Sequence, residues 1–153
     1  MQAISGLAKP ESGNIFIEGT TVFDTFGNSA LVNSVEMEVA ENTDETGLTL
    51  LEYCKKDKKV FVKCEKSKEH YGTGRRIKIC INAYDIALSG EFLSGITIQN
   101  QIEGTVDNLI NRGSTLLCIE NVGFRLVVEI TVESQKRLNI ITGSNAWCMF
   151  KSV

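Results

Sequence analysis

The chain has 153 residues, 42% of them hydrophobic, and a formal net charge of −3. This length is enough to bury a core in one domain or two small ones. The acidic balance argues against general binding to nucleic acid or to an anionic membrane surface. No apolar run approaches the ~18 residues that a membrane-spanning helix requires, so we expect no direct membrane insertion.

Cysteine usage indicates a reducing compartment. Five cysteines occur without any C-x-x-C pair, and His70 is the single histidine, which argues against a zinc site. Residues 1–9 lack the basic start and apolar core of a signal peptide. We therefore expect a cytoplasmic protein with reduced thiols, peripheral to a membrane only through a partner.

The first 30 residues predict one short strand followed by a boundary. Residues 10–13, Pro-x-Ser-Gly, form a turn signal before a strand at 15–17, and residues 26–29 read as a loop. This order resembles the segment after the phosphate-binding loop of ABC ATPases. The phosphate-binding loop itself, the family signature and the catalytic strand have no counterpart. We expect residues 1–30 to be an ABC ATPase remnant, and the protein not to be an enzyme.

Alternating apolar and polar residues predict four strands in the next segment, as at Val35, Met37 and Val39. The strands are expected at 30–39, 48–53, 60–64 and 77–81, with turns at 42–47, 55–58 and 70–74. Residues 55–79 carry ten of the sixteen basic side chains. We interpret these as a solvated strand edge that blocks edge-to-edge pairing, with an anion or partner patch as the alternative.

The last sixty residues begin with a polar step at Thr97-Ile98-Gln99-Asn100, which leads into a strand. Further strands are expected at 115–119, 124–130 and 146–153, with a short helix at 132–139. Cys118 and Cys148 fall inside apolar runs and are predicted to be small core residues.

An internal repeat divides the chain into two similar halves. Residues 47–51 match 113–117 and residues 59–62 match 125–128 at an offset of 66, while 77–79 fall on 146–148 at an offset of 69. Short strands with glycine and asparagine turns and little helix favour small barrels. The repeat predicts two five-stranded units in tandem, one over residues 31–92 and one over 93–153.

The second half resembles the TOBE domain, a molybdate-binding, Mop-like β-barrel found in molybdate-binding proteins and at the C-terminus of ABC transporter ATPase subunits. The resemblance rests on the strand order, on Thr131 and Ser134 at the helix start, and on Lys151-Ser152 at the end. It covers about residues 94–153, and residues 31–93 more loosely. It implies an all-β fold of tandem OB-like barrels with one short helix, as in the regulatory region of molybdate importer ATPase subunits.

The resemblance also implies a site for molybdate or tungstate. The residues at family positions are Thr97, Gln99, Asn100, Thr131, Ser134, Lys151 and Ser152. A tetrahedral dianion offers only acceptors, so its site needs hydroxyls, N–H groups and a cation, but no metal or cofactor. Gln99 stands where the family has arginine, which removes one positive charge.

In family members the anion lies between units from two chains. We therefore expect a homodimer, with the strand edge at 98–106 pairing across the two-fold axis, and possible docking on ABC transporter subunits.

Each candidate residue also fits an ordinary structural role. Thr131 suits a helix N-cap with Ser134 at the third position, and Lys151 suits a solvated charge. The alternative function is therefore a ligand-silent domain that dimerises or docks on a transporter ATPase. A nucleic-acid-binding OB domain would need aromatic platforms on a basic face, whereas Trp147 lies in an apolar run.

Overall fold

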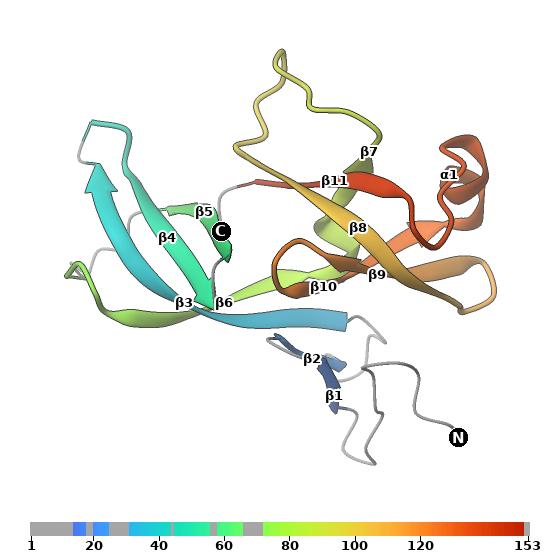
Figure 1. Ribbon diagram of the computed structural model, residues 1–153, viewed down its shortest axis with the longest axis horizontal. Coiled ribbons are helices and arrows are strands. Elements are labelled where there is room, and N and C mark those ends of the chain that lie inside the picture. The colour runs from blue at the N-terminus through green and yellow to red at the C-terminus, as the bar shows by residue number, and fades with distance from the viewer. Residues whose placement is uncertain are drawn as a thin grey trace.

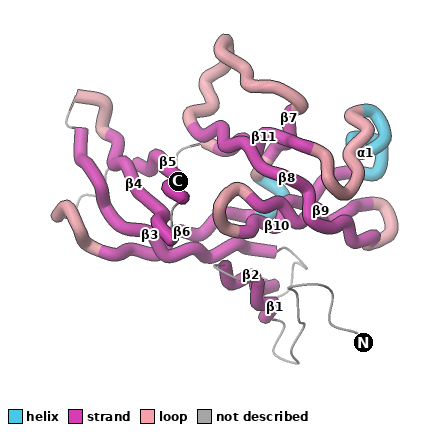
Figure 2. The backbone as a smooth tube through the Cα atoms, in the orientation of Figure 1, coloured by secondary structure: helices cyan, strands magenta, loops and turns pink. Residues whose placement is uncertain are grey.

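The computed structural model describes residues 14–17, 20–24, 31–43, 45–55, 58–65 and 72–151. Within them the chain forms two antiparallel sheets (Figure 1), and the tube in Figure 2 is almost entirely strand and loop. The first sheet contains β1 (Asn14–Ile17), β2 (Thr20–Asp24), β3 (Leu31–Thr43), β4 (Leu48–Lys55), β5 (Lys58–Glu65) and β6 (Arg76–Asn82). The second contains β7 (Ala87–Ser89), β8 (Asn100–Asn111), β9 (Thr115–Asn121), β10 (Arg125–Thr131) and β11 (Asn145–Phe150).

In the part of the chain that the structure describes, helical structure is confined to two short elements. The 3-10 helix η1 (Ala83–Asp85) precedes β7, and the α-helix α1 (Val132–Arg137) connects β10 to β11. Thr131 caps α1 by accepting a hydrogen bond from the Ser134 N–H, as its residue type favours. The expected all-β fold with one short helix is confirmed, although α1 ends two residues before the predicted limit.

Two long strands organise the sheets. β3 pairs first with β6 and then with β4, and β8 pairs first with β11 and then with β9. Each long strand shifts register once, between Val39 and Glu41 in β3 and between Val106 and Asn108 in β8. A β-bulge bends its strand, so one strand can serve two different partners. We refer to β3–β6 as the first unit and to β8–β11 as the second unit.

The matching bulges give the structural register of the repeat. They place Val106 over Val39, and the pairing partners of these two residues are Glu120 and Leu51. The predicted offset of 69 for β6 and β11 is confirmed, because Met37 pairs with Ile77 as Gly104 pairs with Ala146.

The offset of 66 for the middle strands is wrong. It superposes Leu51 on Leu117, whereas the register superposes Leu51 on Glu120. Between the bulge and this position, the second unit has two more residues than the first unit. Between this position and its partner on the following strand, the second unit has five fewer residues. Because an odd shift of register moves a side chain to the other face of a sheet, the sequence alignment put a leucine where the structure buries a glutamate.

Three short elements, β2, η1 and β7, were not predicted from the sequence. β2 pairs with β3 and joins the predicted β1 strand to the first sheet. β7 pairs with β11 and therefore lies in the second sheet, immediately after η1.

Strand β9 is buried along both faces, which explains its continuous apolar run. Leu116 and Cys118 belong to the large core cluster, while Leu117 and Ile119 pack in a second cluster with Leu31, Ala83 and Val127. This second cluster joins the two units. Cys118 and Cys148 are fully buried, which confirms that they are core residues.

Two buried asparagines connect the units reciprocally. Asn33 of β3 accepts a hydrogen bond from the Val127 N–H at 2.8 Å and donates to the Val127 carbonyl at 2.8 Å. Asn100 of β8 accepts from the Lys63 N–H at 2.8 Å and donates to the Lys63 carbonyl at 2.9 Å. The structural register superposes Asn33 on Asn100 and Lys63 on Val127. Such reciprocity is what a local two-fold axis between the units produces.

These asparagines also cap sheet edges. β5 and β10 are the terminal strands of their sheets, and an unpaired strand edge exposes backbone N–H and C=O groups. Each asparagine amide supplies the donor and the acceptor that one residue of a further strand would supply.

Gly104 lies at a close approach between strands of the second unit. A Cβ atom at Gly104 would lie 2.7 Å from Val122 Cγ1, 2.8 Å from the Asn121 carbonyl oxygen and 2.9 Å from Glu120 Cγ. Strand β8 therefore passes directly against the connection between β9 and β10, and a residue without a side chain is required there.

Two predicted absences concern only part of the chain. None of the described helices is long and apolar enough to span a membrane. In the same residues no three His, Cys, Asp or Glu side chains cluster as metal ligands. His70, Ser152, residues 1–13 and residues 25–30 lie outside the described residues.

Candidate functional site

The candidate residues fall into two groups at opposite ends of strand β8. Asn100 begins β8 and pairs with Phe150, which places Gln99 and Lys151 just beyond the same end of the pair. Thr131 pairs with Thr115, next to the other end of β8. Twelve extended residues span up to about 36 Å. One chain therefore does not bring both groups to a single anion.

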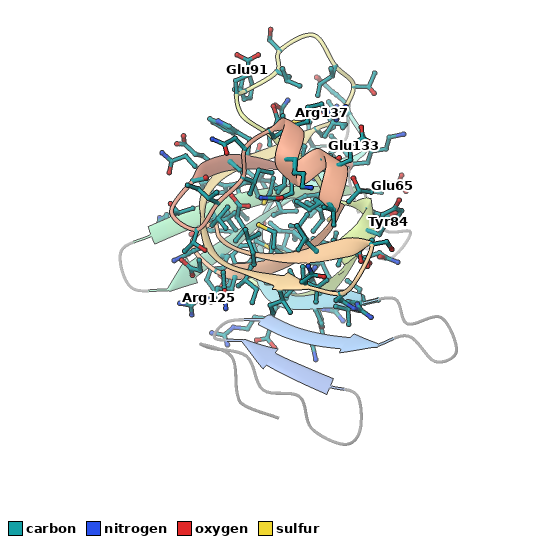
Figure 3. All side chains as sticks on the ribbon, turned by 90° about the vertical axis from the view of Figure 1, so that its right-hand side faces the viewer. Glu65, Tyr84, Glu91, Arg125, Glu133 and Arg137 are labelled. Atoms are coloured by element: carbon teal, nitrogen blue, oxygen red, sulfur yellow. The ribbon has the colours of Figure 1, made fainter. Side chains whose placement is uncertain are left out.

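The views agree on this separation. In Figure 1, β11 runs from the side of α1 towards the C-terminus on the opposite side of the second sheet. In Figure 3 the α1 side faces the viewer, with Glu133 and Arg137 projecting from the helix.

The Lys151 end borders an open pocket of about 450 Å³. Its lining includes Cys80, Ile81 and Asn82 from the end of β6, and Met149, Phe150 and Lys151 from the end of β11. In the structural register these are equivalent residues of the two units, so the pocket lies on the local two-fold axis. Asp85 and Ile98 also line it.

Thr97, Gln99 and Lys151 are all exposed. Lys151 lines the pocket, and Thr97 and Gln99 are the chain neighbours of Ile98, which also lines it. Lys151 supplies an ammonium group, Gln99 an amide and Thr97 a hydroxyl, which are the donor types that an oxyanion requires. Asp85 brings a carboxylate to the same pocket, which opposes the binding of an anion.

The connection that carries Thr97 and Gln99 is held at its base. The Gln101 side chain donates to the Leu93 carbonyl at 2.7 Å and accepts from the Leu93 N–H at 2.9 Å. The ring of Phe92 contacts Trp147 edge-on at a centroid distance of 5.5 Å. These contacts hold both ends of the connection, so they restrict the position of residues 94–99 before the start of β8.

The amide of Asn100 is already engaged within the chain. Besides the two bonds to Lys63, its Nδ2 donates to the Lys151 carbonyl at 3.5 Å. Asn100 thus links the Lys151 backbone to strand β5 of the first unit.

Thr131 and Ser134 form a local pair at the start of α1. The Thr131 hydroxyl donates to Ser134 Oγ at 2.9 Å and accepts from the Ser134 N–H at 3.1 Å. Because the Thr131 proton is used in this pair, the Ser134 O–H is the donor that the pair presents to a ligand. Glu133 lies between them in the first turn and adds a negative charge.

The first unit has different residues at the equivalents of the Lys151 end. The register superposes Asn82 on Lys151 and Val32 on Gln99. Neither is a cation, so the first unit lacks the charge that would hold a dianion there. The sequence offset of 69 could have identified Asn82, but not its place in a shared pocket.

The predicted strand edge at 98–106 is only partly available. Residues 100–105 pair with β11 on one side, and β9 covers β8 from Thr105 onward on the other side. Within the described residues, positions 101–104 have no strand on the β9 side. Pairing of this edge across a dimer stays a prediction.

Comparisons with known proteins agree with the second unit and with the fold. Residues 96–153 match the TOBE domain family, and this span includes all seven candidate residues. No curated protein matches the sequence. The fold is similar to a crystal structure of the cytoplasmic molybdate-binding protein ModG with molybdate bound, with a TM-score of 0.59 and 13% identity. The similarity covers 78% of this chain and 90% of that chain, so it extends over both units, and at this identity it concerns the fold alone.

Proposed function

We propose that this chain is an oxyanion-binding regulatory module whose ligand is molybdate or tungstate. The observation that carries the proposal is the TOBE match over 96–153, which contains every candidate donor in one domain. The likeness in fold to a molybdate-binding protein supports it. A dianion held by hydroxyls, amides and one ammonium group needs no metal or other cofactor.

The separation of the two donor groups favours a site shared between two copies. Lys151 with Gln99 and Thr97 forms one half, and Ser134 with Thr131 forms the other. In a symmetric pair, the Lys151 end of each copy meets the Thr131 end of its partner, which creates two equivalent sites. Ser152 belongs to the first half in this proposal.

Asn100 has a positioning role in this proposal rather than a direct contact with the anion. Its bonds to Lys63 and to the Lys151 carbonyl fix the end of β11 against the first unit. The Lys151 ammonium group then starts from a defined backbone position, which lowers the entropy lost on binding.

The proposed setting follows the same resemblance. The homodimer acts in the cytoplasm, with ABC transporter subunits as possible partners and without nucleic acid. ATP hydrolysis is not part of the proposed function.

The second candidate function is a ligand-silent interaction domain. It is favoured by two negative charges, Asp85 in the pocket and Glu133 beside Ser134, which oppose the binding of an anion. It is also favoured by Gln99, which lacks the positive charge of the arginine at this family position. The two functions differ in whether an oxyanion stabilises the protein.

Thermal denaturation with oxyanions distinguishes them. Molybdate or tungstate at a hundredfold excess over Kd adds about 2.7 kcal/mol of stability, which raises Tm by several degrees. Phosphate should have a much smaller effect. Lys151→Ala should remove most of the shift, since a charge-assisted bond contributes about 1.5–3 kcal/mol, and Gln99→Arg should increase the shift by restoring a cation. An unchanged Tm for the wild type and Gln99→Arg at millimolar molybdate and tungstate would support the ligand-silent domain.

A mixing experiment tests whether the site is shared. Lys151→Ala and Ser134→Ala each place one defect in both sites of a homodimer. A heterodimer of the two variants has one site with both defects and one intact site. When equal amounts exchange at random, about half of the dimers are heterodimers, so mixing the two inactive variants should restore about a quarter of the molybdate that the wild type binds per chain. If mixing restores nothing while the wild type binds, each site lies within one chain.

A further inference from the structure

Glu120 is an acidic residue inside the second unit at a position where the first unit has a leucine. Its relative exposure is 0%, as is that of Leu51, its equivalent in the structural register. Within the described residues, Glu120 Oε1 has no hydrogen-bond partner, and Oε2 accepts a weak bond from Cys118 Sγ at 3.8 Å. Leucine at the equivalent position shows that the packing of such a unit does not require a carboxyl group there.

The titratable neighbours of Glu120 come from three strands and offer no positive charge. Cys118 lies on β9 itself, Cys148 on β11 and Asp107 on β8. The Asp107 carboxylate accepts a bond from Arg125 Nε of β10 at 2.9 Å, which directs that guanidinium towards Asp107. Burial raises the pKa of both thiols, so Cys118 and Cys148 stay neutral at physiological pH.

Burial also raises the pKa of Glu120 from its ordinary 4.5 to about 7. Hydrogen bonds from Cys118 and Cys148 oppose this rise, and the charge of Asp107 adds to it. An ionised carboxylate with an unpaired oxygen is costly in an apolar interior, whereas the neutral acid loses much less solvation.

We propose that the packing of the second unit depends on the protonation of Glu120. The strands pack closely around the neutral carboxylic acid, and β8, β9 and β11 separate locally when the proton is released. The contacts of the residue support this location. The backbone of Glu120 pairs with Val106 of β8 and Leu126 of β10, and Gly104 lies against its Cγ. A water molecule that reaches the ionised carboxylate must therefore separate these strands.

The direction of the pH effect follows from linkage. Between pH 4.5 and about 7, folded Glu120 keeps a proton that the unfolded chain has released. This stabilisation is complete below pH 4.5 and is lost as the pH rises through about 7. Leu51 gives the first unit no such dependence.

The test is the pH dependence of Tm for four proteins. Glu120→Gln keeps the shape without the charge, Glu120→Leu copies the first unit, and Glu103→Gln removes an exposed carboxylate as the matched control. Between pH 5 and pH 8, the wild type and Glu103→Gln should lose about 5–10 °C relative to both Glu120 variants. Parallel curves for all four proteins would overturn the proposal.

A measurement on the wild type covers the case in which neither Glu120 variant folds. Carbon-13 labelling of glutamate side chains should show one carboxyl group that titrates near pH 7. As the pH rises through this value, amide exchange in β9 and β11 should accelerate relative to exchange in β4 and β6. The proposal is wrong if every glutamate titrates near the ordinary pKa of 4.5.

Discussion

The reciprocal asparagines give a quantitative test of how the two units are joined. Asn33→Ala removes three hydrogen bonds, two with Val127 and one to the Ile81 carbonyl at 3.2 Å. Asn33, Val127 and Ile81 are all buried, so the backbone groups that lose their partner are not freely hydrated. Each unsatisfied buried group costs about 1–3 kcal/mol, and with partial relaxation we expect a loss of roughly 3–5 kcal/mol.

Asn100→Ala provides the matched comparison, because it removes the equivalent pair of bonds in the other unit. Its partner Lys63 is an exposed residue, so water replaces part of what the amide supplied. We expect a smaller loss of about 1–2 kcal/mol. The exposed Asn145, with one long bond of 3.4 Å from Thr105, is the control, and Asn145→Ala should change stability by less than about 0.5 kcal/mol.

Urea denaturation at one pH measures all three differences. The midpoints should fall in the order Asn33→Ala, Asn100→Ala, Asn145→Ala, with Asn33→Ala lowest and similar m-values throughout. The reasoning fails if Asn33→Ala costs no more than Asn145→Ala. Separate transitions for the two units in Asn33→Ala would show instead that Asn33 mainly couples them.

Further predictions concern packing and thiol chemistry. Gly104→Ala should lower stability by about 1–3 kcal/mol, since its Cβ would overlap Val122 and the Asn121 carbonyl, and an unchanged urea midpoint would contradict the close approach. Among the four cysteines with described side chains, Cys80 is exposed, so iodoacetamide should modify it first. Cys64, Cys118 and Cys148 should react only after unfolding, because burial raises the pKa of each thiol and restricts access. Peptide mass spectrometry over time checks this order, and equal rates at Cys80 and Cys118 would refute it.

The sequence by itself determined the elements whose signals are local. Period-two alternation predicted the strands, because the inner and outer faces of a half-buried strand differ in polarity. Thr131 and Ser134 marked the start of α1 for a similar reason, since a cap depends only on residues within one turn. The cysteines of the core were identified from the apolar runs around them.

The tertiary structure alone decided what depends on register and on contacts far apart in the chain. The bond between Asn33 and Val127 joins residues 94 positions apart, and no local pattern marks it. An odd error of register between the units hid Glu120, because it exchanges the inner and outer faces of a strand. The candidate residues stand in one domain along the sequence, yet β8 separates them, because a paired strand is extended and holds its two ends apart.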